Sequence, residues 1–258
     1  MAEQKENKSI DELLLDAIIC DEKVPYEIPD NWVWTKLKNV SQVISKGTTP
    51  AGGKSAYLSS GIKFLRVENI NEFGQISNDK GYYIAKETHL NELKRSVLEE
   101  YDVLITIAGT LGKTGYVLGK DLPLNANQAV AFIRLIENLK PYFKFYELLL
   151  RSPLINFSLV KQAKITAIPN LTLEIVRECI IPLPPLAEQE RIVKRIESLF
   201  EKLDKAKELI DCFDQIETMK KTILAKAFRG QFDTNDPTDE PASKLLKRIL
   251  EEKYSQRC

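Results

Sequence analysis

The chain has 258 residues, which is enough for one large domain or two smaller ones with an ordinary hydrophobic core. Its four cysteines lie far apart, without a C-x-x-C pair or a histidine cluster, so their pattern argues against a zinc module, a redox motif and a disulfide-dependent fold. The opening is polar and acidic, and no apolar run approaches the roughly 18 residues that a membrane span needs, so we expect a cytoplasmic protein without a membrane partner.

Charge is unevenly distributed along the chain, although 37 basic and 37 acidic side chains give a formal net charge of zero. Residues 1–34 carry 3 basic and 9 acidic side chains (net −6), residues 35–170 carry 18 and 11 (net +7), and residues 171–258 carry 16 and 17 (net −1). The basic excess therefore lies in the middle of the chain. By itself it fits an ordinary solvated surface as well as a nucleic-acid partner.

Residues 1–30 are predicted to form an N-terminal helical segment. The stretch SIDELLLDAIIC carries apolar residues at helical spacing, and Ser9 stands where a helix cap is expected. Pro25 and Pro29 then interrupt the pattern.

Residues 31–185 are predicted to form one mixed domain in which a few helices pack on strands. Short apolar runs bounded by Gly, Asn and Pro predict strands at KFLRVENI, GYYIA, DVLITIAG, TGYVLG and AVAFIRLI. Helices are expected over Thr88–Glu100 and at YFKFYELLLRS, where Pro141 suits a first helical turn. The fold class is therefore α+β.

Residues 186–229 are predicted to form one long coiled-coil helix, because no Gly or Pro interrupts them and apolar residues recur at steps of four and three. After one further three-residue step the pattern continues to residue 223. Such a helix would run about 60 Å and needs a partner helix from a second copy or another chain; the alternative is packing along its own domain. The expected dimer-interface residues are Ile192, Ile196, Leu199, Leu203, Ala206, Ile210, Phe213, Ile216 and Ile223. Gly230 ends this helix, and residues 230–258 are expected to be a polar tail with a short helix at ASKLLKRILEEKY.

The sequence contains no recognisable catalytic set. His89 is the only histidine, in a charged helical stretch where we expect a solvated side chain, and no G-x-S-x-G turn is present. The stretch AGTLGKTG lacks the first glycine of a phosphate-binding loop, since that position is Ile107. Asp30 and Glu92 are too far apart in sequence to make a convincing metal-nuclease pattern. We therefore expect a non-enzymatic chain without a metal site.

Binding chemistry is richer, in three loops of the basic domain. They are centred on SKGTTPAGGKSAYLSSG, on GKT and on VKQAKITAIPN, and they combine lysines and hydroxyls with backbone amides that suit phosphate oxygens. Nearby Arg and amide side chains are of the kind that read base edges. The candidate nucleic-acid-binding residues are Lys46, Thr48, Thr49, Lys54, Arg66, Asn69, Lys113, Thr114, Asn127, Gln128, Lys161, Lys164 and Asn170.

Several stretches resemble one known family. IPLPPLAEQERIVKRI resembles the junction between the target recognition domain and the long helix in specificity subunits of type I restriction-modification systems. LLLDAIICDEKVPYEIPDNWVWTKL resembles the opening of that family, GTTP and GIKFLRVENI resemble boxes within its recognition domain, and AFRGQFDTNDPTDEPASKLLKRIL resembles its closing segment. Members usually hold two recognition domains and two long helices, whereas this chain has one of each.

The resemblance implies a target recognition domain over residues 31–185 that reads double-stranded DNA. Two copies, joined through an antiparallel coiled coil, would read a symmetrical, interrupted site. It also implies modification subunits that use S-adenosylmethionine to methylate a flipped adenine, and a restriction subunit that uses ATP and Mg²⁺; no cofactor is expected in this chain. The alternative is a coiled-coil adaptor whose head binds protein, without a role for DNA.

Overall fold

The structure is a computed structural model that describes residues 9–19, 24–77, 81–163, 170–209 and 213–255. Its helices are α1 (Ile10–Ala17), α2 (Lys86–Leu90), α3 (Phe143–Arg151), α4 (Pro153–Ala163), α5 (Leu173–Arg177), α6 (Leu186–Leu209), α7 (Phe213–Ala227) and α8 (Ala242–Ser255). Its strands are β1 (Val33–Lys36), β2 (Ser41–Lys46), β3 (Ile62–Leu65), β4 (Tyr82–Ile84), β5 (Val103–Thr106), β6 (Thr114–Tyr116), β7 (Leu124–Ala126), β8 (Val130–Leu135) and β9 (Ile180–Leu183). None of these helices is long and apolar enough to cross a membrane.

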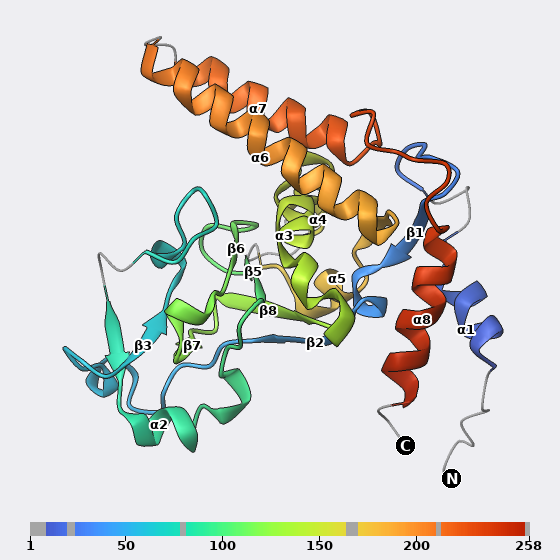
Figure 1. Ribbon diagram of the computed structural model, residues 1–258. Helices are drawn as coiled ribbons and strands as arrows, with labels where there is room; N and C mark the ends of the chain where they lie inside the picture. The colour runs from blue at the N-terminus through green and yellow to red at the C-terminus, as the bar shows by residue number, and fades with distance from the viewer. Residues whose placement is uncertain (1–8, 20–23, 78–80, 164–169, 210–212, 256–258) are drawn as a thin grey trace.

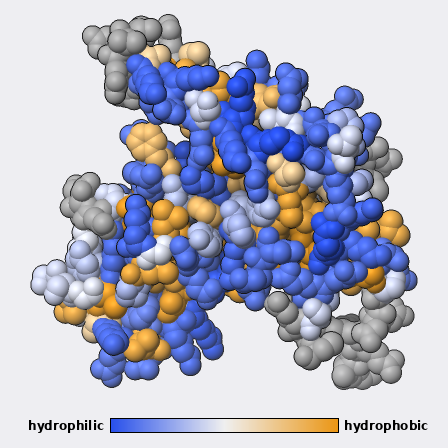
Figure 2. Space-filling model, viewed as in Figure 1, coloured by the Kyte–Doolittle hydropathy of each residue, from blue (hydrophilic) through white to orange (hydrophobic). Residues whose placement is uncertain are grey.

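The strands form three small sheets. One has the order β2-β8-β5-β6 with antiparallel neighbours, one has the order β4-β3-β7 with β3 and β7 parallel, and β1 pairs with β9 alone. All four residues of β5 are buried, and α3 packs against β5 and β6. Figure 1 shows the β4-β3-β7 sheet at the left and the β2-β8-β5-β6 sheet near the centre, with the hairpin of α6 and α7 above them; β1 lies at the right, near α8 and α1. Hydrophilic side chains cover most of the face shown in Figure 2, and apolar ones form smaller patches.

Most of the predicted elements are confirmed. Ser9 caps α1 through a capping box with Glu12, and each of the five predicted apolar runs contains a strand. The helix expected over Thr88–Glu100 is wrong, because the chain forms only the short α2 and a single 3₁₀ turn at Lys94–Ser96. The mixed arrangement of helices and sheets agrees with the predicted class.

The prediction of one continuous helix after the prolines is wrong. The chain forms α6 and α7, which pack against each other as a hairpin (Figure 1), so α6 receives its partner helix from its own chain. Ile192 and Ile196 are fully buried and Ile216 is 6% exposed, so these three side chains are not available to a second copy. The remaining described members of the expected interface are half-buried: Leu199, Leu203, Ala206 and Ile223. Ile210 and the side chain of Phe213 lie outside the described part of the chain.

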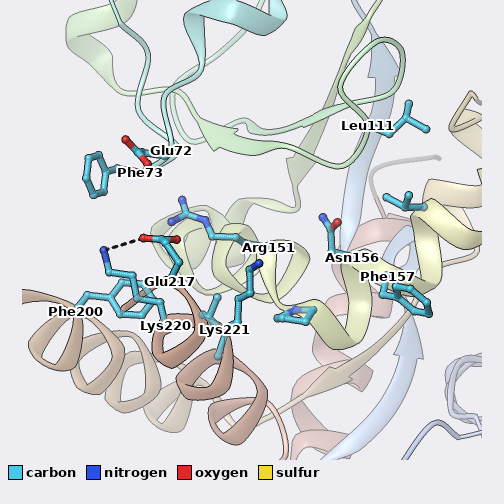
Figure 3. Close-up of a pocket in the computed structure, with 13 residues that line it drawn as sticks. Glu72, Phe73, Leu111, Arg151, Asn156, Phe157, Phe200, Glu217, Lys220 and Lys221 are labelled. Atoms are coloured by element: carbon cyan, nitrogen blue, oxygen red, sulfur yellow. Dashed lines mark ion pairs between the residues drawn. The ribbon is translucent and has the colours of Figure 1, made fainter. Parts of the chain in front are cut away.

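Lys220 connects the hairpin to the strand domain. Its Nζ lies 2.7 Å from Asp204 Oδ1 across the hairpin and 5.7 Å from the ring centres of both Phe200 and Phe73. Phe73 belongs to the loop between β3 and β4, so the ammonium group bridges two parts of the fold. Figure 3 shows Phe73, Phe200 and Lys220 around a cleft between hairpin and domain, whose volume is about 520 Å³.

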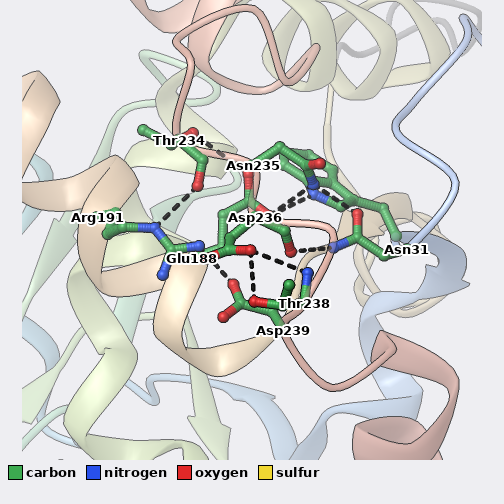
Figure 4. Close-up of polar contacts among 9 residues, drawn as sticks. Asn31, Glu188, Arg191, Thr234, Asn235, Asp236, Thr238 and Asp239 are labelled. Atoms are coloured by element: carbon green, nitrogen blue, oxygen red, sulfur yellow. Dashed lines mark hydrogen bonds and ion pairs between the residues drawn. The ribbon is translucent and has the colours of Figure 1, made fainter.

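A buried carboxylate joins three segments that are distant in sequence. Glu188, in the first turn of α6, is fully buried; its Oε2 accepts hydrogen bonds from Trp32 Nε1 (2.9 Å) and Asn235 Nδ2 (3.2 Å), and its Oε1 accepts one from Thr234 Oγ1 (3.3 Å) (Figure 4). Arg191 Nε donates to the Thr234 carbonyl at 2.8 Å. The proline junction therefore directs α6 into a site built by the start and the end of the chain.

Candidate nucleic-acid interface

The ends of β2, β3, β5 and β7 meet at one edge of the strand domain. The parallel pair β3 and β7 is in register at Leu65 and Ala126, so both strands end together. The ends of β2 and β5 lie beside the start of β8, with Lys46 opposite Ala131 and Thr106 opposite Val130. Since β7 leads directly into β8, both sheets contribute turns to this edge. We call residues 46–49, 66–69, 108–113 and 127–129 the strand-end surface.

A hollow of about 430 Å³ lies in the strand-end surface. Arg66, Lys113 and Asn127, which were predicted separately from sequence, all line it although they come from three different turns. The other lining residues are Val67, Glu68, Ala108, Gly109, Thr110 and Ala129. The fold thus gathers a guanidinium, an ammonium and an amide around one depression, which suits a ligand rich in hydrogen-bond acceptors.

The turn that carries Lys113 is held by a buried threonine. Thr106 Oγ1 donates to the Thr110 carbonyl and accepts a hydrogen bond from the Lys113 amide at 2.9 Å, while the Thr106 amide donates to the Lys113 carbonyl at 2.8 Å. Gly109 has φ +74, in the left-handed region that glycine adopts without strain. These hydrogen bonds join the two ends of the turn, so the backbone of Lys113 has a fixed position.

Close backbone packing brings the first loop to the same surface. A Cβ on Gly47 would lie 2.1 Å from the Ala126 carbonyl oxygen, so only glycine lets these two backbone segments approach this closely. The Thr48 amide donates to the same carbonyl at 3.0 Å, and Thr49 Oγ1 donates to Gln128 Oε1. Two further predicted residues, Thr49 and Gln128, are thus in direct contact beside the hollow.

Arg66 is held at both its backbone and its side chain. Its amide donates to Asn69 Oδ1 at 2.9 Å, its Nη1 lies 3.3 Å from Glu68 Oε1, and its Cζ lies 4.6 Å from the centre of the Tyr82 ring. Tyr82 in turn packs on Tyr57 with ring centres 4.9 Å apart. The guanidinium therefore has a defined position at the wall of the hollow.

The other predicted residues that remain accessible lie around this surface or outside it. Lys46, Lys54 and Lys161 are exposed. Asn170 is exposed beside Leu171, whose amide donates to the Ile107 carbonyl at 3.0 Å, so Asn170 lies near the residue that leads into the turn of Lys113. Lys164 lies outside the described residues.

Two residues predicted to contact nucleic acid, Asn69 and Thr114, are buried, so the prediction is wrong for them. Asn69 is 2% exposed and supports the Arg66 backbone, and Thr114 is 4% exposed with its Oγ1 donating to Glu147 Oε1 at 2.7 Å. Both polar groups have partners inside the domain, so neither side chain faces a ligand on the surface.

His89 is also buried rather than solvated. It is 8% exposed, and its Nδ1 is within hydrogen-bonding reach of Asn125 Oδ1. Asn125 is itself fully buried and donates to the Leu93 carbonyl at 3.1 Å. This pair therefore ties α2 to β7. Within the described part of the chain, no group of three or more His, Cys, Asp or Glu side chains is arranged to hold a metal ion.

Sequence reasoning missed Glu68 and Tyr82. Glu68 lies in KFLRVENI and Tyr82 lies in GYYIA, and both runs predict strands. An aromatic residue in such a run indicates a strand and does not mark a binding site. No sequence signal marks their position: Tyr82 pairs with Phe64 across β3 and β4, and Arg66 follows directly after the end of β3.

Comparison with known proteins gives a consistent result. Residues 29–211 match the family model described as the type I restriction modification DNA specificity domain. The specificity subunit of the type I restriction enzyme EcoBI from Escherichia coli is 30% identical over 88% of this chain and 49% of its own length. The MjaVIII specificity subunit from Methanocaldococcus jannaschii is 30% identical over 80% of this chain and 47% of its own length. The chain spans about half the length of these relatives.

Solved structures share the fold. The HsdS subunit from Thermoanaerobacter tengcongensis superposes with a TM-score of 0.56 at 24% identity, covering 73% of this chain and 47% of that one. A chain from a structure of a type I restriction-modification system gives a TM-score of 0.56 at 20% identity, covering 86% and 51%. Because the family model matches well over half of its residues, the chain belongs to the family of type I restriction-modification DNA specificity domains.

Proposed function

We propose that this chain is the DNA-recognition component of a type I restriction-modification complex and that its strand-end surface holds double-stranded DNA. The observation that carries the proposal is the meeting of Arg66, Lys113 and Asn127 at one hollow, in a chain of this family. Arg and Lys suit phosphate and guanine acceptors, and Asn suits base edges. Lys46 and Lys54, both exposed, would extend the contact along the DNA backbone.

In this proposal the chain itself performs no chemistry. Modification subunits carrying S-adenosylmethionine would dock on it and methylate a flipped adenine, and a restriction subunit using ATP and Mg²⁺ would join them for cleavage. The cytoplasm is the proposed location of the assembly. The junction around Glu188 supports a rigid relation between the DNA-binding domain and the hairpin, which a docking platform requires.

A second copy of the chain would complete a bipartite site. The supporting fact is that the chain spans about half of its curated relatives. Two identical domains related by a twofold axis would read a symmetrical, interrupted sequence, because protein symmetry is mirrored in the half-sites.

The hairpin offers a surface for this pairing, because Leu199 and Leu203 are half-buried and Met219 is 51% exposed. Met219→Glu should convert the dimer to a monomer in analytical ultracentrifugation without disturbing the hairpin. Leu199→Glu with Leu203→Glu should do the same. An unchanged mass for both variants would mean that the hairpin does not join two copies.

The test of DNA recognition is duplex binding by the chain together with the modification subunits of its host, measured at increasing salt. We expect affinity to fall steeply between low and moderate salt, because bound lysines and arginines release counterions from the phosphates. Mapping of methylated adenines in the treated DNA would then give the target. A flat salt response without methylation at defined sites would refute the proposal and favour a protein-binding adaptor.

A further inference from the structure

Arg66 and Glu68 form a matched pair of donor and acceptor at the wall of the hollow. Nη1 of Arg66 and Oε1 of Glu68 are 3.3 Å apart, both side chains line the hollow, and they are 33% and 46% exposed. One ion pair leaves most of the five N–H donors of a guanidinium for another partner, and the carboxylate retains acceptor capacity. The pair is electrically neutral as a unit.

The neighbouring carboxylate decides between two possible ligands for Arg66. A phosphate placed on this guanidinium would lie within a few ångströms of the Glu68 carboxylate, and the like charges would repel. A base edge is uncharged and can satisfy both groups together. Base contact therefore fits the pair better than backbone contact.

The Tyr82 ring preorganises the pair. The guanidinium lies 4.6 Å from the ring centre, and Tyr82 is held by packing against Tyr57 and by its pairing with β3. An arginine that is already stacked loses less side-chain entropy when it forms two parallel hydrogen bonds. Asn69 also fixes the backbone of Arg66, because the Oδ1 of this buried residue accepts a hydrogen bond from the Arg66 amide.

We propose that Arg66 and Glu68 together read one G·C base pair through its major-groove edge. Arg66 donates two hydrogen bonds to O6 and N7 of the guanine, and Glu68 accepts one from the N4 amino group of the paired cytosine. A G·C pair presents these two acceptors and this donor in that groove, whereas an A·T pair presents a different order of groups and a methyl. This inference rests on the proposed binding of duplex DNA.

The test is selection from random duplexes by the full chain with its modification subunits. The wild type should select a fixed G·C pair at one position of the half-site. Arg66→Lys retains the charge but cannot form the bidentate contact, so preference for that pair should fall between about 5-fold and about 150-fold while other positions stay selected. Glu68→Gln should weaken preference at the same position. Lys54→Ala is the matched control and should lower affinity for all sequences about equally.

Salt dependence supplies a second readout. Arg66→Gln should leave the slope of log affinity against log salt unchanged, whereas Lys54→Ala should reduce its magnitude by about 0.9 if Lys54 binds a phosphate. If Arg66→Gln and Arg66→Lys keep the wild-type base preference, or if Arg66→Gln reduces the slope like Lys54→Ala, Arg66 is a phosphate contact and the inference is overturned. If the wild type binds no duplex at all, the proposed function fails instead.

Discussion

Glu188 is the residue whose loss should most damage the junction between the domain, the hairpin and the tail. In Glu188→Ala the buried indole N–H of Trp32 loses its acceptor, which costs about 1–3 kcal/mol. The hydrogen bonds from Thr234 and Asn235 to a charged oxygen are lost as well, and they contribute at least as much. We therefore expect the free energy of unfolding to fall by about 3–5 kcal/mol, a large part of the roughly 5–15 kcal/mol of a typical domain.

The assay is equilibrium unfolding in urea, with the midpoint compared at constant slope. Glu188→Gln should cost only about 1–2 kcal/mol, because its amide oxygen can accept from Trp32 while its NH₂ group donates to the Thr234 hydroxyl. The matched control is Glu190→Ala, since Glu190 is exposed two residues away and should matter by less than about 0.5 kcal/mol. A Glu188→Ala variant as stable as the Glu190→Ala variant would refute the reasoning.

Other elements of the structure give further expectations. Lys220→Gln should destabilise the hairpin by about 1 kcal/mol and speed hydrogen exchange in α7 about fivefold, whereas the exposed Lys194→Gln should change neither. Burial raises the pKa of the Cys179 thiol to about 12, so mass spectrometry should find Cys179 unalkylated at pH 8 until the protein is unfolded. Hydrogen bonding, most of all by Lys36, lowers the pKa of Glu178; its stabilising effect is present above the ordinary glutamate pKa and is lost as pH falls through the lowered value. In Lys36→Met, carboxyl NMR should place the Glu178 titration at higher pH.

The elements that the sequence predicts well depend on local signals. The capping box at Ser9 and Glu12 lies within one helical turn, and the apolar, largely β-branched run of β5 is visible in the sequence although its pairing with β6 and β8 is not. The hairpin could not be predicted in the same way, because an apolar stripe has the same spacing whether its partner is the same chain or another one. No Gly or Pro marks the change from α6 to α7 in sequence; only the register slip between Phe213 and Ile216 lies beside it.

The candidate site was predictable by residue type but not by arrangement. Arg66 and Asn127 are neighbours because β3 and β7 pair in parallel across a long stretch of sequence, and that register depends on the whole core. Thr114 and His89 were predicted to be accessible but are buried. The polarity of a side chain does not show whether its hydrogen-bond partner is water or another group of the domain. Buried polar groups with partners look like binding residues when only their type is known.

The most direct test of DNA contact at the strand-end surface is site-specific photocrosslinking to duplex DNA. A photoreactive phenylalanine analogue would replace Gln128, which is exposed beside the hollow, or Tyr254, which is 40% exposed on α8 at the other side of the molecule (Figure 1). We expect the probe at position 128 to crosslink to the duplex and the probe at position 254 to remain free. Equal crosslinking at both positions, or crosslinking at position 254 alone, would contradict the assignment of this surface to DNA.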